Sequence, residues 1–383
     1  MRKAFYIDSF SSDHFHEMFN ASSLLMFSHL YDNIDYYAQK NSIVNVTKLL
    51  GSLPSNVKPH THNIKENKKS RVNHAIKQIR SVLLNLYYIL KAPRDTDVII
   101  NYNTVIALYP INYLVKILKK RVLVVCHSEM QDIQGLRPTS LLFQKSIRFF
   151  KEKDVKVAKT LWFCVLGDAI RKNVLQIVSP QIAEKLLSFD HTAVFNYNVD
   201  GIQSVQDKTL KLGYIGGFRD SKGTKMFMEL SKFFHDDNKI EFRFIGNVQG
   251  NQKELEASGV VIPQGIGSFF IQREDMYRHI KQLDYVLFCF PPDGYKFTAS
   301  GSLFDAIDNE IPILSLKNDY FEGMFHDFGD FGYLEDDVDG LKRRILWLKE
   351  HKNDSKWNIR SVKQKVSPAS AAQRFSKSKW FES

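Results

Sequence analysis

Residues 212–223 read LGYIGGFRDSKG, and this stretch decides the fold of the second half of the chain. An apolar strand runs into Gly216 and Gly217, a turn with Arg219 and Lys222 follows, and a helix then begins. Glycines let the backbone approach a ligand closely, and a helix N-terminus beside cations favours an anion. We expect this turn to hold a diphosphate, with Arg219 and Lys222 as its counter-charges. The alternative is a plain glycine turn with solvated cations.

A second loop of similar character lies at residues 295–306 (YKFTASGSLFDA), after the predicted strand Tyr285–Phe290. The turn Ser300-Gly301-Ser302 opens an apolar helix, so free N–H groups and hydroxyls lie at its N-terminus. A serine in this place could equally be an ordinary N-cap. Because both loops follow strands of one parallel sheet, we expect them to open on the same edge of that sheet.

Short apolar strands alternate with helices along the whole chain. Residues 121–126 (RVLVVC) are the clearest strand of the first half, and His127 follows them directly. Residues 51–71, which are polar and basic, are predicted to be an exposed loop. The alternation predicts the α/β class, with parallel sheets covered on both faces. The other predicted strands are Ala4–Ile7, Ser42–Leu49, Asp97–Ile100, Leu161–Leu166, Lys211–Ile215, Glu241–Ile245, Val260–Ile262, Tyr285–Phe290 and Pro312–Leu316.

The length of the chain predicts more than one domain. It has 383 residues, and a domain usually has about 100–200. Residues 195–208 are polar and without a period, so we place the boundary there. We predict a Rossmann-like domain over residues 1–200, a second over 209–355 and a basic C-terminal segment over 356–383.

The composition is that of a globular protein with an anionic partner. Lys and Arg exceed Asp and Glu by 53 to 42, which gives a net charge of +11. The sequence contains no RNA-recognition motif and no helix-turn-helix, so we expect no nucleic acid. Three cysteines in apolar runs, Cys126, Cys164 and Cys289, are expected to be buried, reduced thiols. Since no signal peptide and no membrane-spanning run is found, we expect a cytoplasmic protein.

Residues 210–316 resemble the nucleotide-sugar-binding domain of GT-B glycosyltransferases, particularly the large retaining family that includes bacterial polysaccharide enzymes. In that family a strand ends in Gly and Arg, and a Lys-Gly pair opens the next helix. Lys222-Gly223 match this pair. The family's arginine position falls on Gly217, with Arg219 as the nearest substitute. The resemblance implies two Rossmann-like doubly wound domains that face each other across a cleft. It also implies that the C-terminal segment 356–383 crosses back to the first domain.

Further positions of this family can be placed on the chain. It carries two glutamates separated by seven residues, of which the second holds the donor ribose. This second position aligns with Asp305, whereas the first aligns with Phe297, whose side chain cannot form hydrogen bonds or carry a charge. The stretch Asn196–Asp200 (NYNVD) resembles the Asn-Gly-Val-Asp stretch that ends the first domain of relatives.

In the first half the resemblance is one of architecture. Relatives place a histidine after a central strand of this domain, facing the donor sugar, and His127 has the matching place with Glu129 and Asp132 behind it. A strand-end histidine bonded to backbone is the alternative. The resemblance implies His127 and Asp305 as catalytic residues. The implied donor-binding residues are Gly216, Gly217, Arg219, Lys222, Ser300, Gly301 and Ser302.

The activity that the resemblance implies is transfer of a sugar from a nucleotide diphosphate-sugar donor to a glycan or polyprenyl-linked acceptor in bacterial surface polysaccharide synthesis. GT-B enzymes stabilise the leaving diphosphate with basic side chains and helix N-termini, so we expect no metal and no cofactor. Asp95-Thr96-Asp97 precedes its apolar run, and we interpret it as a turn and strand start. Retention is implied, although Phe297 departs from the retaining pattern. The alternatives are a nucleotide-sugar epimerase of the same fold and a non-transferring GT-B partner protein.

Residues 139–157 (TSLLFQKSIRFFKEKDVKV) predict an aromatic, cationic helix. Such a helix can lie on an anionic membrane surface, at the inner face of the plasma membrane. The alternative is a helix that packs its apolar side inward and leaves its lysines in solvent.

Overall fold

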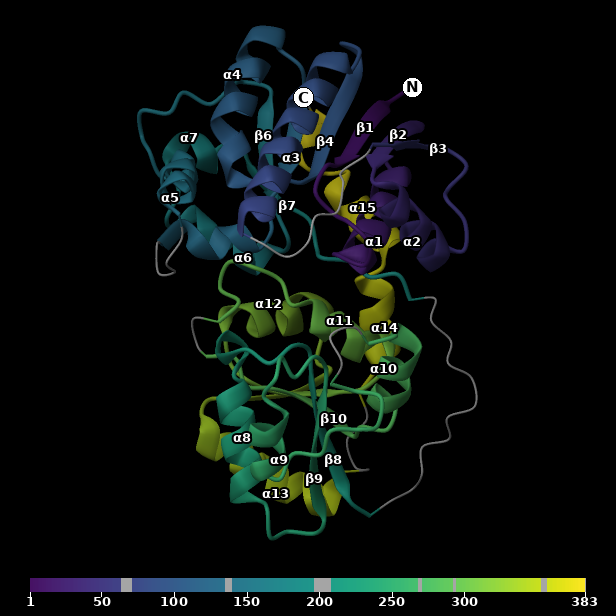
Figure 1. Cartoon of the computed structure of the whole chain (residues 1–383), viewed down its shortest axis with the longest axis vertical. Helices are drawn as coiled ribbons and strands as arrows, with labels where there is room; N and C mark the ends of the chain where they lie inside the picture. Colours follow the sequence, from purple (N-terminus) through teal and green to yellow (C-terminus); the bar gives the residue numbers. More distant parts are fainter. Residues whose placement is uncertain are drawn as a thin grey trace. The chain divides into compact units, whose positions relative to one another are not determined.

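The computed structural model describes residues 1–62, 71–134, 140–195, 208–267, 271–291, 294–352 and 357–382. The chain folds into two compact units (Figure 1). The first contains residues 1–196, 297–299 and 366–383, and the second contains residues 197–296 and 300–365. The Asn196–Asp200 motif and Lys356, where the C-terminal segment is predicted to start, lie outside the described residues, as does most of the predicted boundary stretch.

Seven parallel strands form the sheet of the first unit, in the order β3-β2-β1-β4-β5-β6-β7. Every residue of β5 and β6 is buried, as is typical of parallel strands covered on both faces. Between β1 and β4 the strand order reverses, and such a point leaves a crevice at the carboxyl ends of the strands. The strands are β1 Lys3–Asp8, β2 Asn33–Ala38, β3 Val57–Thr61, β4 Thr96–Tyr102, β5 Val122–Val125, β6 Leu161–Val165 and β7 Leu186–Ser188.

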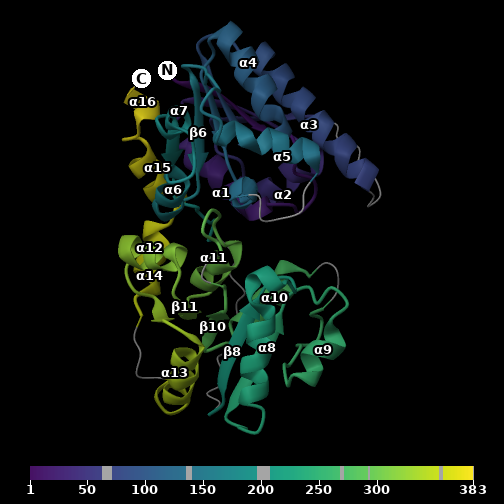
Figure 2. The same cartoon turned by 90° about the vertical axis from the view of Figure 1, so that its left-hand side faces the viewer.

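Helices cover this first sheet on both faces. Figure 2 shows α3 and α4 on one side of it and α15 and α16 on the other. The helices are α1 Glu17–Ser28, α2 Lys40–Leu50, α3 Arg71–Lys91, α4 Leu108–Leu118, α5 Leu141–Ile147, α6 Asp168–Leu175, α7 Pro180–Ala183, α15 Pro368–Phe375 and α16 Lys379–Glu382. Short 3₁₀ segments lie at Val105–Ala107, Ser128–Gln134 and Arg148–Phe150.

The second unit repeats this plan with five parallel strands in the order β12-β11-β10-β8-β9. The strand order reverses between β8 and β10. The strands are β8 Leu210–Ile215, β9 Ile240–Ile245, β10 Tyr285–Phe288, β11 Ile313–Leu316 and β12 Gly332–Glu335. The helices are α8 Thr224–Phe233, α9 Gln252–Ala257, α10 Arg273–Ile280, α11 Gly301–Asp308, α12 Asp319–Phe328, α13 Val338–His351 and α14 Ile359–Lys365. The prediction of an α/β chain with two doubly wound, Rossmann-like sheets is confirmed.

The predicted strand Ser42–Leu49 is wrong, because these residues form α2. Its buried residues are Ser42, Val46 and Leu49, a spacing of four and three that places them on one helical face. Val44 points to solvent and is 57% exposed. The β-branched residues of this stretch favour a strand by propensity, but the pattern of burial is that of a helix.

Two other local predictions also need correction. Residues 51–71 are not only a loop, since β3 lies within them as the edge strand of the first sheet and pairs with β2. Pro59 is tolerated there because an edge strand has one side without partners. Val260–Ile262 is not a full strand: Val261 makes a single parallel bridge to Arg243 of β9.

The predicted long helix over residues 139–157 is broken in the structure. Helix α5 ends at Ile147, and a single 3₁₀ turn follows. Ile147, Phe149 and Phe150 are buried, so the inward-packing alternative is right for them, whereas Leu141 and Leu142 are exposed. Thr139 lies outside the described residues.

The three cysteines are buried free thiols, as predicted. Burial raises the pKa of each thiol, which keeps Cys126, Cys164 and Cys289 protonated and unreactive. Within the described ranges, no helix has both the length and the apolar character that crossing a bilayer would require.

The segment after Val366 completes the core of the first unit. Helix α15 packs on α1, where the rings of Phe375 and Phe27 lie 6.0 Å apart. Trp380 is fully buried, and its indole N–H donates to the hydroxyl of Tyr31 at 2.8 Å. The first sheet is therefore covered in part by residues that follow the second unit in sequence.

Candidate functional site

The loop after β8 is built around glycines that no other residue could replace without strain. Gly216 has a φ of 127° and Gly223 a φ of 73°, a region that residues with a side chain rarely adopt. A Cβ atom on Gly223 would lie only 1.7 Å from the carbonyl oxygen of Cys289. The start of α8 therefore touches the backbone just after β10, across the point where the strand order reverses.

Hydrogen bonds hold this loop in one shape. The hydroxyl of Tyr214 donates to the carbonyl oxygen of Gly217 at 3.1 Å. The hydroxyl oxygen of Thr224 accepts from the backbone N–H of Arg219 at 3.0 Å and lies 2.9 Å from the carbonyl of the same residue. Because Thr224 is fully buried, these bonds fix the turn before any ligand binds.

Lys222 points back over the glycine turn. It ends the 3₁₀ segment Asp220–Lys222, and its Nζ lies 3.3 Å from the place that a Cβ on Gly216 would occupy. Among the described residues, its ammonium has no ion-pair partner within 4.0 Å. The side chain of Arg219, two residues after the glycines, is exposed. The turn thus presents two cations beside a bare backbone.

Asp305, on α11, lies close enough to Lys222 for the two charges to interact. Burial raises the pKa of the Asp305 carboxyl, and Arg273 and Lys222 oppose this shift with their positive charge. The Arg273 guanidinium lies 3.1 Å from the Asp305 carboxylate, which is 18% exposed. Arg273, which comes from α10, was not predicted from the sequence. Both predicted loops therefore meet at one edge of the second sheet.

The Ser300–Ser302 turn does not cap its helix in the ordinary way. Ser300 has the N-cap position of α11, but its hydroxyl makes no capping hydrogen bond. It lies 3.2 Å from the hydroxyl of Ser302, and both serines are buried. Nothing lies within 4 Å of the place that a Cβ on Gly301 would occupy. The simple N-cap alternative is thus not what the structure contains.

His127 follows β5 in the first unit, as predicted, and is almost fully buried. Its Nε2–H donates to the carbonyl oxygen of Asn101 at 2.7 Å, so Nδ1 is the nitrogen that can accept. Burial lowers the pKa of His127 to about 4, and the ring is neutral at pH 7. His127 is therefore bonded to the backbone, as the alternative interpretation predicted, and Nδ1 is still able to accept a hydrogen bond. His127 is better suited to accept a hydrogen bond than to take up a proton.

Two further histidines surround His127 and were not predicted. The ring of His16, at the N-terminus of α1, lies 5.5 Å from that of His127. Burial lowers the pKa of both His16 and His191 to about 3. Although three histidines gather here, no group of His, Cys, Asp or Glu in the described ranges is placed to hold a metal ion. Asp97 of the Asp-x-Asp match lies in β4 and accepts from Tyr31, so that match is a strand start.

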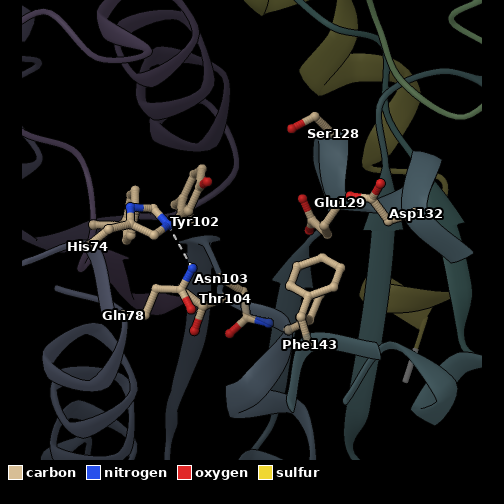
Figure 3. Close-up of a pocket in the computed structure, with 11 residues that line it drawn as sticks. His74, Gln78, Tyr102, Asn103, Thr104, Ser128, Glu129, Asp132 and Phe143 are labelled. Carbon is tan, nitrogen blue, oxygen red and sulfur yellow. Dashed lines mark hydrogen bonds between the residues drawn. The ribbon is translucent and has the colours of Figure 1, made fainter. Parts of the chain in front are cut away.

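A pocket of about 140 Å³ opens at the carboxyl ends of β1, β4 and β5 in the first unit. Figure 3 shows His74 and Gln78 of α3 on one wall, and Glu129 and Asp132 on the other. Burial raises the pKa of Glu129 to about 7. The remaining lining residues are Phe10, Tyr102, Asn103, Thr104, Val105, Ser128 and Phe143.

The pocket combines aromatic side chains with hydrogen-bond acceptors and small polar groups. Its residues come from five separate segments of the chain, so sequence analysis predicted only the neighbourhood of Glu129 and Asp132. Aromatic faces and carboxylates suit a ligand rich in hydroxyl groups, because rings pack on C–H faces while carboxylates accept from hydroxyls.

The sequence and the structure were compared with those of known proteins, and only the structural comparison finds similar proteins. No protein-family model matches the sequence, and no curated protein matches it. The crystal structure of TarM, known from S. aureus, superposes with a TM-score of 0.67 at 14% identity, covering 100% of this chain and 99% of that one. HepE from Anabaena, in complex with UDP and glucose, gives 0.63 at 12% identity, covering 98% of each chain.

A third similar structure, from Listeria monocytogenes, is described as a UDP-N-acetylglucosamine 2-epimerase. Its TM-score is 0.56 at 12% identity, covering 98% of this chain and 95% of that one. Similarities at such identities, over almost the full length of each chain, establish the GT-B fold: two Rossmann-like domains in one polypeptide.

Proposed function

We propose that this protein is a glycosyltransferase that uses a nucleotide diphosphate-sugar. The observation that carries the proposal is the edge of the second sheet, where the glycine turn and Lys222 meet Asp305 and Ser300–Ser302. Two structures of the same fold support it by what they hold: HepE binds UDP-glucose, and TarM has been crystallised with UDP and α-GlcNAc-glycerol. We infer that the donor diphosphate binds over Gly216 and Gly217.

Departure of the nucleoside diphosphate is the step that this site would assist. Negative charge develops on the diphosphate as the bond to the sugar breaks, and groups already in place stabilise it without reorganising. Lys222 and Arg219 supply positive charge, and the N–H groups at the start of α8 and α11 supply dipoles. We propose that these groups replace a metal ion in that role.

Asp305 and His127 are proposed to orient the donor. An ionised carboxylate is an acceptor only, and Asp305, held by Arg273, is suited to accept from the hydroxyls of a ribose. His127 offers Nδ1 to a sugar hydroxyl. Phe297, which is 2% exposed, cannot replace the missing first glutamate. We propose retention from the family resemblance, to be checked by the NMR coupling constant of the anomeric proton in the product.

The pocket of the first unit is proposed to hold the acceptor, which we expect to be a glycan or polyprenyl-linked sugar of bacterial surface polysaccharide synthesis. Glu129 and Asp132 would accept from acceptor hydroxyls, and Phe10, Tyr102 and Phe143 would pack on the sugar. The Asp132 carboxylate, together with Glu129 where it is ionised, favours a neutral sugar in the pocket over an anionic one.

Nucleotide binding and product release test the proposal. A thermal-shift panel of nucleoside diphosphates should identify the base, and the matching nucleotide-sugars should then release nucleoside diphosphate when an acceptor is added. An epimerase, which the Listeria similarity keeps as the second candidate, would interconvert sugars without that release. Binding of the donor with neither outcome would indicate a non-transferring partner protein. Failure of every nucleotide to bind would overturn the proposal.

A further inference from the structure

Exposed apolar side chains gather on three helices of the first unit. Of the seventeen large apolar side chains that are exposed in the described residues, ten lie on α3, α4 and α5. Single exposed apolar residues are normal on a protein surface, but such a concentration marks an interaction site. The ten are Val72, Ile79, Leu83, Tyr87, Leu90, Tyr109, Tyr113, Ile117, Leu141 and Leu142.

The five on α3 form a stripe along one side of the helix. Their spacing of seven, four, four and three residues keeps them within an arc of about 80° at 100° per residue. The buried side chains of the same helix, Ser81, Asn85, Tyr88 and Ile89, lie on the opposite side. The apolar stripe of α3 therefore faces away from the side of the helix that meets the core.

Helices α4 and α5 extend the stripe. Tyr109, Tyr113 and Ile117 follow each other at intervals of four, so they share one face of α4. Helix α4 packs beside α3, and α5 packs against the 3₁₀ turn that leads into α4. Figures 1 and 2 show α3 and α4 side by side on the outside of the first unit.

The charge of the same helices is entirely positive. Helices α3, α4 and α5 contain six Lys or Arg residues and no Asp or Glu. Four exposed cations lie on or directly after α4 and α5, and none of them forms an ion pair within the described part of the chain. They are Lys116, Lys119, Lys145 and Arg148.

We propose that the α3–α4–α5 face docks the protein on an anionic lipid bilayer. The apolar side chains would enter the boundary between headgroups and acyl chains, the tyrosines would lie at the headgroup level, and the cations would contact lipid phosphates. A second copy of the chain is a poor occupant, because two such cationic faces would repel each other. The surface predicted from residues 139–157 is thus only the margin of a larger one.

Helices α3 and α5, which carry the docking face, also contribute residues to the pocket of the first unit. His74 and Gln78 of α3 and Phe143 of α5 line that pocket. At 100° per residue, His74 and Gln78 lie on the same side of α3 as its buried residues, opposite the apolar stripe, so the pocket and the stripe lie on different sides of this helix. The docking does not rest on the proposed function.

Cosedimentation with vesicles tests the docking. The full-length protein is mixed with vesicles of phosphatidylglycerol and phosphatidylcholine, or of phosphatidylcholine alone, at low and high salt. The apolar variant is Leu83→Gln with Tyr113→Gln. Its matched control is Val44→Gln with Phe233→Gln, two side chains of similar exposure outside the three helices. Calorimetry with UDP reports the donor site independently.

We expect the wild type and the control to bind anionic vesicles in a salt-sensitive way, and the apolar variant to bind at least about tenfold more weakly. Replacing the four exposed cations with Gln should lower binding to anionic vesicles by a similar factor or more, since each cation near the surface contributes about fivefold. An unchanged circular-dichroism spectrum and an unchanged Tm in every variant would show that the fold of the first unit is intact.

Three results would overturn the inference: no binding of the wild type to anionic vesicles, equal binding to neutral vesicles, or equal loss in the control. A fourth is a change in oligomeric mass of the apolar variant by ultracentrifugation while its vesicle binding persists, which would make the face a contact between copies. Each is distinct from failure of the proposed function, which calorimetry and product release measure.

Discussion

Replacing Lys222 with Ala tests the donor site most directly. Its ammonium lies over the glycine turn, and no ion pair in the described residues competes for it. A hydrogen bond from a charged group contributes about 1.5–3 kcal/mol. Since about 1.4 kcal/mol corresponds to a factor of ten, Lys222→Ala should raise the Kd for the nucleoside diphosphate that the thermal-shift panel identifies by about 10- to 150-fold. Isothermal titration calorimetry measures this change.

The matched control is Lys225→Ala, three residues further on. Lys225 is exposed and already paired with Asp220 at 2.8 Å. Its removal should leave the Kd within about twofold, because exposed ion pairs contribute little. If Lys222→Ala also left the Kd within twofold of the wild type, the turn would not bind a diphosphate and the argument for a donor site would fail.

Three further substitutions test the fold and the electrostatics. Gly223→Ala should lower the free energy of unfolding of the second unit by more than about 3 kcal/mol in urea denaturation, because the new Cβ would overlap the backbone of Cys289. The control Gly250→Ala also has a positive φ, but its Cβ would enter open space, so it should lose only about 1 kcal/mol. Equal losses in the two variants would show that the Gly223 turn relaxes. Glu129→Gln should raise the Tm at pH 8 but not at pH 4. Burial raises the pKa of Glu129 from 4.5 in the unfolded chain to about 7 in the folded protein. The stability that the protonated carboxyl allows is therefore fully present below pH 4.5 and is lost as the pH rises through 7, because the folded protein must then bury a charge that Gln lacks. The same gain at both pH values would contradict that cause. Arg273→Met should raise the pKa of Asp305, because it removes the positive charge that opposes the effect of burial. As the pH is lowered, Asp305 should therefore become protonated, and the donor affinity should fall, at a higher pH in the variant than in the wild type. Identical pH profiles of donor affinity by calorimetry would exclude a donor contact through Asp305.

The sequence was sufficient where burial and propensity agree. In β5 and β6 every residue is both β-favouring and buried, and the strands were predicted correctly. In α2 the two signals conflict: Ile43 and Val44 favour a strand, yet the buried set follows helical spacing. Strand β2 (NIDYYA) carries polar residues and was not predicted, because its partners on both sides supply hydrogen bonds that no local pattern reveals.

The same distinction applies to the candidate site. Lys222 was predicted from the glycine turn that precedes it, whereas Asp305 was predicted only from the resemblance to GT-B glycosyltransferases. Arg273 could not, since its ion pair joins residues 32 positions apart. The exposed stripe of α3 was also missed: apolar residues lie all around that helix, and periodicity alone does not tell which side meets the core.

The return of residues 366–382 to the first unit has a consequence for biosynthesis. Trp380 and Phe375 belong to the core around α1, so the N-terminal half cannot finish folding while the ribosome is still translating the second unit. Until release, α1 exposes the apolar surface that α15 later covers, which is a hazard for aggregation. Nascent chains stalled before α15 should therefore depend on chaperones, and cells should degrade versions cut short at this point.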